Sequence, residues 1–519
     1  MHIAPGQASE KFLRAVTKIV GSDHISLADL DRLSYSRDLN PVSNLSTNEG
    51  RFGPMPDAVV WPADTQQVVQ IVKLAAEHRT PIIAFGAGSG VCGGTVPLRG
   101  GIILDLKRLN QIIKLDEDSL AVTAGAGIIG QHLEMELNRK GYTMGHFPSS
   151  VYSSTLGGYL AARSAGQLSA KYGKIEDMIL GLEAVLGTGE ILRTPATPRA
   201  SLGPDWNQVL IGSEGTLAII TEATCRIRPY PAERRFSSFV FPGPTEGTEA
   251  IRQIMRHELR PAAIRLYDEL DTVLVGTSSK NEESSESFWN AIPISQFGNF
   301  VKSVAPGLIR RTERFFGKRA DLINLLEKFA TKGCLLVMTF EGESDLVADE
   351  ETLATELCEK LGGVNHGPEA ALRWWNNRYH VSYKQSKVFY HGAIVDTIEM
   401  ATTWDKLVPL YEEVRKAVRD MAFIMAHFSH AYLDGASVYF TFVTAAPTVE
   451  KAEQAHRAVW DAAATACQRV GAAVSHHHGI GYTKARFMNE EHGQMMRVYE
   501  ALKREMDPAG ILNPGKMGL

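Results

Sequence analysis

The sequence predicts an α+β protein with more than one domain. Its 519 residues are 44% hydrophobic and 22% charged, enough apolar material for large cores. Short apolar strands alternate with amphipathic helices and glycine-rich loops over 56–232, whereas glycine-rich loops are scarce over 233–445. This difference predicts an α+β domain followed by a second domain, in which an antiparallel sheet carries helices over one face.

Composition also limits the possible partners and location of the protein. The balance of 54 basic and 59 acidic residues, net charge −5, gives no indication of a nucleic-acid partner. The 5 cysteines are an odd number without CxxC spacing, which is atypical of a disulfide framework or a zinc site. The N-terminus lacks a basic segment followed by an apolar run, and no stretch reaches the roughly 18 apolar residues of a membrane span. We therefore expect a cytoplasmic protein.

Periodicity predicts the elements in order. Within 1–55 we expect a helical segment over 9–33 and a loop from Asn40 to Pro56. The other expected helices cover 64–79, 127–140, 249–258, 321–330, 346–361, 404–419, 449–470 and 487–506. The expected strands cover 58–62, 81–85, 101–106, 120–125, 218–228, 334–340 and 436–442.

Three stretches rich in glycine or serine separate the strands of the first domain: 86–94, 148–166 and 211–217. Consecutive backbone amides in such loops form a concave anion site, although a single loop of this kind also suits a surface hairpin. A Rossmann fingerprint is excluded because the first loop continues into Thr95–Gly101, which cannot be helical, and no Gly-Lys-Ser/Thr of a P-loop follows. Together the three stretches predict a site for a long, extended dinucleotide.

The order of these motifs resembles the FAD-binding domain of the vanillyl-alcohol oxidase/p-cresol methylhydroxylase flavoproteins. The motifs are Gly86-x-Gly88-Ser89-Gly90, Thr155-x-Gly157-Gly158, Tyr172-Gly173-x-Ile175-Glu176-Asp177, Gly212-Ser213-Glu214-Gly215-Thr216-Leu217 and the ending Asp507–Lys516. The resemblance implies a two-subdomain (PCMH-type) FAD-binding domain over 56–232, with 446–519 returning to the flavin site. Members that attach FAD through histidine carry it within the 86–90 loop; this loop has none, which implies non-covalent FAD.

Further motifs are similar to the alkyldihydroxyacetonephosphate (alkylglycerone-phosphate) synthases of that superfamily. They are Arg163–Gln167, Pro261–Leu266, Thr397–Asp405 and Ser475–Gly481. The resemblance extends over nearly the whole chain and makes 233–445 the cap or substrate domain. It implies a transferase of ether lipid synthesis, which exchanges the acyl group of acyl-dihydroxyacetone phosphate for a long-chain alcohol.

The expected cofactor-binding residues lie in and around the three loops. They are Gly86, Ala87, Gly88, Ser89, Gly90, Pro148, Ser149, Ser154, Thr155, Gly158, Arg163, Ser164, Glu214, Gly215 and Ile220.

Three consecutive histidines, His476, His477 and His478, precede Gly479. If they lie on a strand, adjacent side chains point to opposite faces, so at most two could share a metal ion. A metal site, a solvated loop and an active-site loop are the alternatives. We favour the active-site loop, with imidazoles that move protons and bind phosphate, and we expect no metal.

Tyr439 follows a turn at Asp434-Gly435, and strand alternation places it on one face with Ser437 and Thr441. A tyrosine in this position is either an ordinary half-buried strand residue or an acid/base beside a flavin. The synthases have their proposed catalytic tyrosine at this place, so the resemblance implies that Tyr439 is catalytic.

Arg265 lies on an otherwise apolar predicted strand. A buried guanidinium needs an anionic partner, which is either structural, as Asp268 or Glu269 would be, or a substrate phosphate.

A second cation for the substrate is less clearly placed. The eukaryotic-type synthases carry a phosphate-binding arginine where this chain has Gln385. Arg378, Lys384 or Lys387 could substitute for it, and arginine is the better bidentate phosphate ligand.

The pattern of residues 297–319, where aromatic and basic side chains interleave, fits either a face lying in a membrane interface or a helix packed on its own domain. We expect a homodimer with a lipid-like or hydroxy-acid substrate.

Two reactions remain open. The first is the transferase, in which Tyr439 and the histidines move protons and Arg265 holds phosphate. The second is an FAD-dependent dehydrogenase or oxidase of a 2-hydroxy acid or alcohol, with Arg378 holding a carboxylate, and the missing arginine favours it. A flavin-binding protein without catalysis is a third, weaker alternative.

Overall fold

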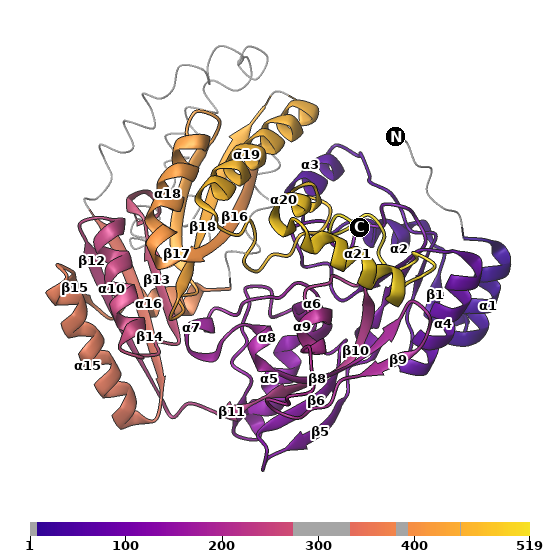
Figure 1. The fold of residues 1–519 in the computed structure, drawn as a ribbon, viewed down its shortest axis with the longest axis horizontal. Coiled ribbons are helices and arrows are strands. Elements are labelled where there is room, and N and C mark those ends of the chain that lie inside the picture. Colours follow the sequence, from indigo (N-terminus) through magenta and orange to yellow (C-terminus); the bar gives the residue numbers. More distant parts are fainter. Residues whose placement is uncertain (1–7, 273–332, 380–392, 447) are drawn as a thin grey trace. The chain divides into compact units, whose positions relative to one another are not determined.

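The computed structural model describes residues 8–272, 333–379, 393–446 and 448–519. They form two compact units, the first made of Met1–Tyr230 with Ser475–Leu519 and the second of Pro231–Val474 (Figure 1). The expected helix over 321–330, the basic and aromatic segment 297–319 and Lys384 lie outside the described residues. Among the described helices, none is long and apolar enough to cross a membrane.

A small, mostly parallel sheet begins unit 1. Its order is β1-β2-β4-β3, with strands β1 (Ile25–Ser26), β2 (Ala58–Val60), β3 (Ile82–Phe85) and β4 (Ile102–Asp105). Helices α1 (Glu10–Val20) and α4 (Thr65–His78) share a buried core with these strands. The C-terminal tail joins the same core, because Leu512 forms a parallel bridge to Ile82.

An antiparallel sheet forms the other half of unit 1. Its order is β5-β6-β10-β8-β9, with strands β5 (Ile112–Asp116), β6 (Ala121–Gly125), β8 (Ile179–Leu186), β9 (Ile191–Arg193) and β10 (Ala218–Arg226). A separate pair consists of β7 (Tyr142–Thr143) and β11 (Arg228–Pro229). The helices around them are α5 (Gly130–Arg139), α6 (Leu156–Ala161), α7 (Ser169–Tyr172), α8 (Ile175–Met178) and α9 (Trp206–Leu210).

The N-terminal predictions are partly wrong. The expected helix over 9–33 is broken, because β1 pairs with β2 between α1 and α2 (Asp29–Ser34). The expected loop contains helix α3 (Pro41–Asn48), since the Asn40 side chain accepts hydrogen bonds from the first free amides and proline occupies the first turn.

The expected helix over 487–506 is also interrupted. It consists of α20 (Met488–His492) and α21 (Met495–Met506), separated at Gly493, whose φ of +50° ends the first helix.

A seven-stranded antiparallel sheet forms unit 2. Its order is β15-β12-β14-β13-β17-β18-β16, with strands β12 (Glu233–Phe241), β13 (Ala263–Tyr267), β14 (Cys334–Gly342), β15 (Val364–Gly367), β16 (Ala393–Thr403), β17 (Phe423–Ser429) and β18 (Gly435–Ala445). The predicted α+β class is confirmed.

Helices cover unit 2 unevenly. Those in contact with one another along one face are α10 (Pro244–Arg256), α15 (Ser344–Lys360), α18 (Trp404–Val418) and α19 (Val449–Val470) (Figure 1). Helix α16 (Glu369–Asn377) differs from the expectation of helices over one face only. It packs through Ala371 against Tyr267 and Val337, whereas α10 packs against Leu266, which points the other way.

Candidate functional site

The glycine loop after β3 lies against the start of α6. Gly86 approaches Thr155 so closely that any added Cβ would clash with the threonine Oγ1. Gly88 has φ +61°, a backbone conformation that side chains disfavour. Two expected cofactor loops are thus adjacent, and the close approach of Thr155 and Phe85 leaves no space for a side chain at Gly86 or Gly88.

The second loop uses most of its hydroxyls internally. Thr155 caps α6 by accepting from the Gly158 amide at 3.2 Å, and the Ser154 hydroxyl donates to the Ser150 carbonyl at 2.7 Å. The Ser149 hydroxyl accepts from Gln167 Nε2 at 3.1 Å. These bonds fix the loop beside buried Pro148.

Arg163 and Ser164, at the end of α6, contact other protein groups. Arg163 has φ +49°, and its guanidinium donates to the side chain and backbone oxygens of Gln208 at 2.9 and 2.6 Å. The Ser164 hydroxyl is 2.7 Å from Nε2 of buried His146. Burial, together with the charge of Lys174, lowers the pKa of His146 to about 3, so this imidazole is neutral.

The third loop is tied to the histidine loop through a carboxylate. Glu214 is buried, and its two carboxylate oxygens accept from the amides of Ile480 and Gly481 at 2.5 and 2.8 Å. Burial raises the pKa of Glu214, while these two bonds lower it. Nδ2 of Asn513 donates to the carbonyls of Gly94 and Glu214, so the C-terminal tail closes the same region.

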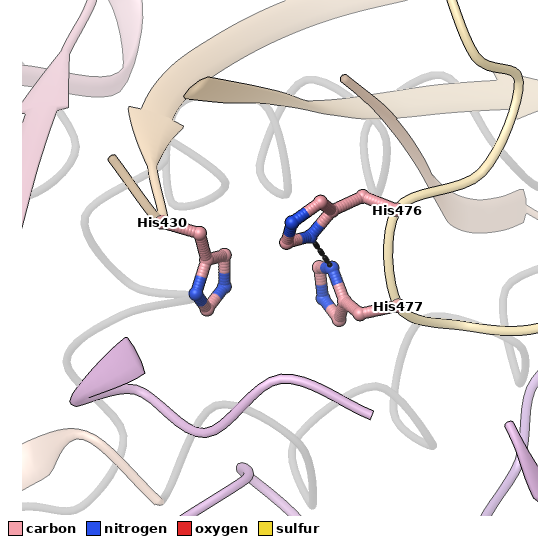
Figure 2. A group of neighbouring side chains, drawn as sticks. All are labelled: His430, His476 and His477. Carbon is pink, nitrogen blue, oxygen red and sulfur yellow. Dashed lines mark hydrogen bonds between the residues drawn. The ribbon is translucent and has the colours of Figure 1, made fainter. Parts of the chain in front are cut away.

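Residues 476–478 lie in a loop of bends, so strand alternation does not limit which of their side chains can meet. Nδ1 of His476 is 2.9 Å from Nδ1 of His477, as Figure 2 shows. Lys174 Nζ donates to the His476 carbonyl at 2.7 Å, which holds the loop on α8. The loop conformation lets the first two imidazoles turn toward one another. His430, drawn in the same figure, belongs to unit 2.

One face of the unit 2 sheet carries a row of polar side chains from four adjacent strands. Tyr267 on β13 is the register partner of His427 on β17, His427 of Tyr439 on β18, and Tyr439 of Glu399 on β16. Arg265 lies two residues before Tyr267 and therefore on the same face. The residues that alternate with this row along the strands, such as Leu266 and Phe440, are apolar and buried. They point to the opposite face of the sheet, which α10, α18 and α19 cover.

Tyr439 lies within this row. Burial raises the pKa of Tyr439 to about 12, a hydrogen bond with Thr397 lowers it, and the charge of Glu399 raises it. Its ring is stacked on His427, with centroids 4.8 Å apart and planes 15° apart.

Arg265 faces aromatic rings. Its guanidinium carbon lies 5.5 Å from the centre of the Trp374 indole and 6.0 Å from that of Tyr267. The nearby Asp268 carboxylate instead accepts from the Ala426 amide and the Tyr411 hydroxyl, at 2.9 and 3.2 Å.

Arg378 follows α16. Its guanidinium lies 3.7 Å from the centre of the Trp375 ring and 4.4 Å from that of Tyr379, and it donates to the Trp375 carbonyl. Its role toward a substrate stays a prediction.

Several residues of these sites were missed from the sequence. His427 and Asp271 are buried and 3.2 Å apart, and Lys174 holds the histidine loop. The alternation of β17 opposite Tyr439 could have indicated His427, but Asp271 could not be placed without the strand register.

Comparison with known proteins identifies the family. Residues 56–195 match the FAD binding domain and residues 230–517 match the C-terminal domain of FAD linked oxidases. The chain is 31% identical to alkyldihydroxyacetonephosphate synthase of Caenorhabditis elegans, over 90% of this chain and 76% of the relative. It is 27% identical to glycolate oxidase subunit GlcD of Bacillus subtilis, over 96% and 95%.

Solved structures agree. An alkyldihydroxyacetonephosphate synthase superposes with a TM-score of 0.76 at 25% identity, covering 99% of this chain and 86% of the other. A p-cresol methylhydroxylase superposes with 0.74 at 18% identity, covering 99% and 98%, which supports the fold alone.

The chain belongs to the FAD-linked oxidase family, and its cofactor is FAD. Within that family it is grouped with the alkyldihydroxyacetonephosphate synthases, to which the C. elegans relative belongs.

The residues of unit 1 fit this cofactor. Near the first and third loops, where Asn513 bonds to the carbonyls of Gly94 and Glu214, Oδ1 of Asn513 and Oγ1 of Thr95 are buried polar atoms without a hydrogen-bond partner among the described residues. Such groups are normally satisfied, so they suit a polar ligand.

Proposed function

We propose that this protein is an FAD-dependent transferase of the alkylglycerone-phosphate synthase type, which exchanges the acyl group of acyl-dihydroxyacetone phosphate for a long-chain alcohol. The observation that carries the proposal is the polar face of the unit 2 sheet, where Arg265 on β13 and Tyr439 on β18 lie on the same side, separated by β17. It combines a fixed cation for a phosphate with an acid/base for a carbon acid. Synthases are also among the relatives that match most of the chain.

Each residue has a separate role in the proposal. Arg265 binds the phosphate in this proposal: its guanidinium lies over aromatic rings, the Asp268 carboxylate is bonded elsewhere, and the buried Asp271 is the acidic group that its charge affects within the protein. Tyr439 takes and returns the proton next to the substrate carbonyl. Its pKa of about 12 makes the phenol a proton donor at neutral pH, so it needs help to act as a base. His476 and His477 move protons for the carboxylate that leaves and the alcohol that enters.

The three loops of unit 1 would hold FAD through Gly86–Gly90, Ser149–Thr155 and the backbone at Glu214–Gly215. When bound, FAD supplies an electrophilic ring nitrogen that can accept a carbon or a hydride. The 86–90 loop lacks histidine, which supports non-covalent attachment.

A second candidate function is oxidation of a 2-hydroxy acid. It is favoured by Gln385, which stands where the synthases have a phosphate-binding arginine, and by relatives that include glycolate oxidase subunit GlcD and a D-lactate dehydrogenase. Arg378 would then hold the substrate carboxylate.

Anaerobic mixing distinguishes the two reactions. For the transferase we expect labelled fatty alcohol to enter acyl-dihydroxyacetone phosphate, with the flavin oxidised at the end of turnover. Loss of the yellow flavin absorbance with D-lactate or glycolate, and no exchange of label, would instead establish the dehydrogenase.

Peripheral membrane contact through 297–319, a homodimer and a cytoplasmic location remain predictions. A lipid-like substrate agrees with the synthase relatives. Flotation with anionic vesicles tests the membrane contact, and sedimentation tests the dimer.

A further inference from the structure

Tyr439 does not stand alone on its sheet face, because a buried imidazole lies parallel to its ring. His427 is only 8% exposed, and it is sandwiched in the row between Tyr267, with ring centroids 5.6 Å apart, and Tyr439. Parallel stacking at 4.8 Å restricts how the phenol can tilt. The orientation of the imidazole therefore affects the orientation of Tyr439.

A carboxyl group fixes the plane of that imidazole. A hydrogen bond of 3.2 Å joins Nδ1 of His427 to Oδ2 of Asp271, which is 6% exposed. Asp271 is held in turn, because its amide donates to Asp268 at 2.9 Å, and Asp268 also receives the Ala426 amide beside His427. Asp268 thus holds Asp271, Asp271 holds His427, and His427 contacts Tyr439.

Burial disfavours charge on both members of the pair, while the nearby Arg265 disfavours a charged imidazole and favours a charged carboxyl group. Burial and the nearby Arg265 lower the pKa of His427 well below its usual range. Burial raises the pKa of Asp271 to about 7, while Arg265 lowers it. A buried hydrogen-bonded polar pair adds little net stability, because apolar side chains of similar size often pack at least as well. Stability therefore does not explain why His427 and Asp271 lie on the polar face, whereas the stacking of His427 on Tyr439 does.

We propose that Asp271 and His427 are positioning residues that hold the Tyr439 phenol in its reactive orientation. The proposal rests on the acid/base role assigned to Tyr439 above. It adds that the role of Tyr439 depends on the hydrogen bond between His427 and Asp271, which does not itself involve Tyr439. A misplacement of about 1 Å can cost about 100-fold in rate, so loss of the anchor lowers turnover more than substrate binding.

The test uses the flavin-loaded full chain and compares His427→Phe with Asp271→Asn. Phenylalanine keeps a flat ring beside Tyr439 but cannot bond to Asp271, and we expect kcat to fall about 10- to 100-fold with KM changed less than about 3-fold. Asparagine places a carbonyl oxygen and an amide NH2 where the carboxyl group was, so it can pair with either imidazole tautomer. We expect Asp271→Asn to stay within about 3-fold of the parent enzyme.

His456→Phe is the matched control. His456 is equally buried and bonded to the carboxylate of Asp396 at 2.7 Å, but that pair points to the helix-covered face. We expect it to lower Tm and leave kcat within about 2-fold, which separates positioning from general loss of packing.

A parental kcat in His427→Phe, or kcat losses in His427→Phe and His456→Phe that simply follow Tm, would overturn the proposal. Should His427→Phe fail to fold, Asp271→Leu makes the same comparison with Asp271→Asn. Tyr439→Phe distinguishes failure of the positioning proposal from failure of the acid/base role assigned to Tyr439. If it loses turnover while His427→Phe does not, only the positioning proposal fails, and if it keeps turnover, the acid/base role fails with it.

Discussion

The two units solve different binding problems with different materials. In unit 1 the candidate cofactor site is made of backbone, with glycine loops that approach one another and carboxylates that bond to amides. In unit 2 the candidate catalytic face is made of side chains that four strands bring into one row. A backbone site tolerates little added volume, whereas a side-chain site tolerates volume but depends on the chemistry of individual groups.

The largest effect should follow from filling the backbone site. Gly86→Val places a branched side chain against Thr155, so we expect loss of bound FAD and with it all turnover. Flavin absorbance per chain after gel filtration measures this. Gly53→Val is the control, because no atom lies within 4 Å of its Cβ position, and equal flavin loss in both variants would refute the role of the loop.

A smaller effect is expected at Glu214, whose side chain binds the backbone of the histidine loop. Glu214→Ala leaves the amides of Ile480 and Gly481 without their acceptors, at a cost of about 1–3 kcal/mol per buried group. We expect a lower Tm, weakened FAD binding and lower kcat from a loosened histidine loop. Glu214→Gln retains one acceptor oxygen, so its Tm, FAD binding and kcat should lie between those of the parent and those of Glu214→Ala. Unchanged kcat in Glu214→Ala would contradict the proposed link between Glu214 and the histidine loop.

The smallest effect concerns a carboxyl group away from the proposed chemistry. Glu134 of α5 is buried, and burial raises its pKa to about 7 despite bonds from Met144 and Gly145. The folded state therefore holds a proton that the unfolded state has released above its pKa of about 4.5, so stability falls as pH rises from about 4.5 to 7.

Glu134→Gln imitates the protonated form and should flatten this part of the stability profile, by about 1–3 kcal/mol in urea unfolding. Identical pH profiles for the variant and the parent would contradict the raised pKa. Turnover at fixed pH should not change.

The same contrast explains what the sequence could reveal. Backbone sites leave glycine motifs in consecutive residues, so the loops at 86–94 and 211–217 were predictable. Strands β2, β3, β4, β6 and β10 of unit 1 were also predicted, whereas the eight-residue strand β8 was missed. Helix α3 was missed because Asn, Ser and Pro indicate a loop until the Asn40 cap is seen to begin a helix. The break at Gly493 was missed because a single glycine within a polar stretch is also compatible with a continuous helix.

The side-chain site was predictable only in part. Tyr439 was found through strand alternation and family resemblance, but its contact with His427 depends on strand register, which one sequence does not reveal. Asp271 lies 156 residues before His427 and joins it only through the pairing of β13 with β17. Arg265 was placed correctly on a strand, although its aromatic neighbours were not foreseen.

Turnover and flavin content of Tyr439→Phe, measured on the same preparation with His477→Ala beside it, test the division between the units most directly. We predict that both variants retain FAD at the parental stoichiometry and lose turnover by about 100-fold or more. Parental turnover in Tyr439→Phe, or loss of FAD together with turnover, would contradict the account.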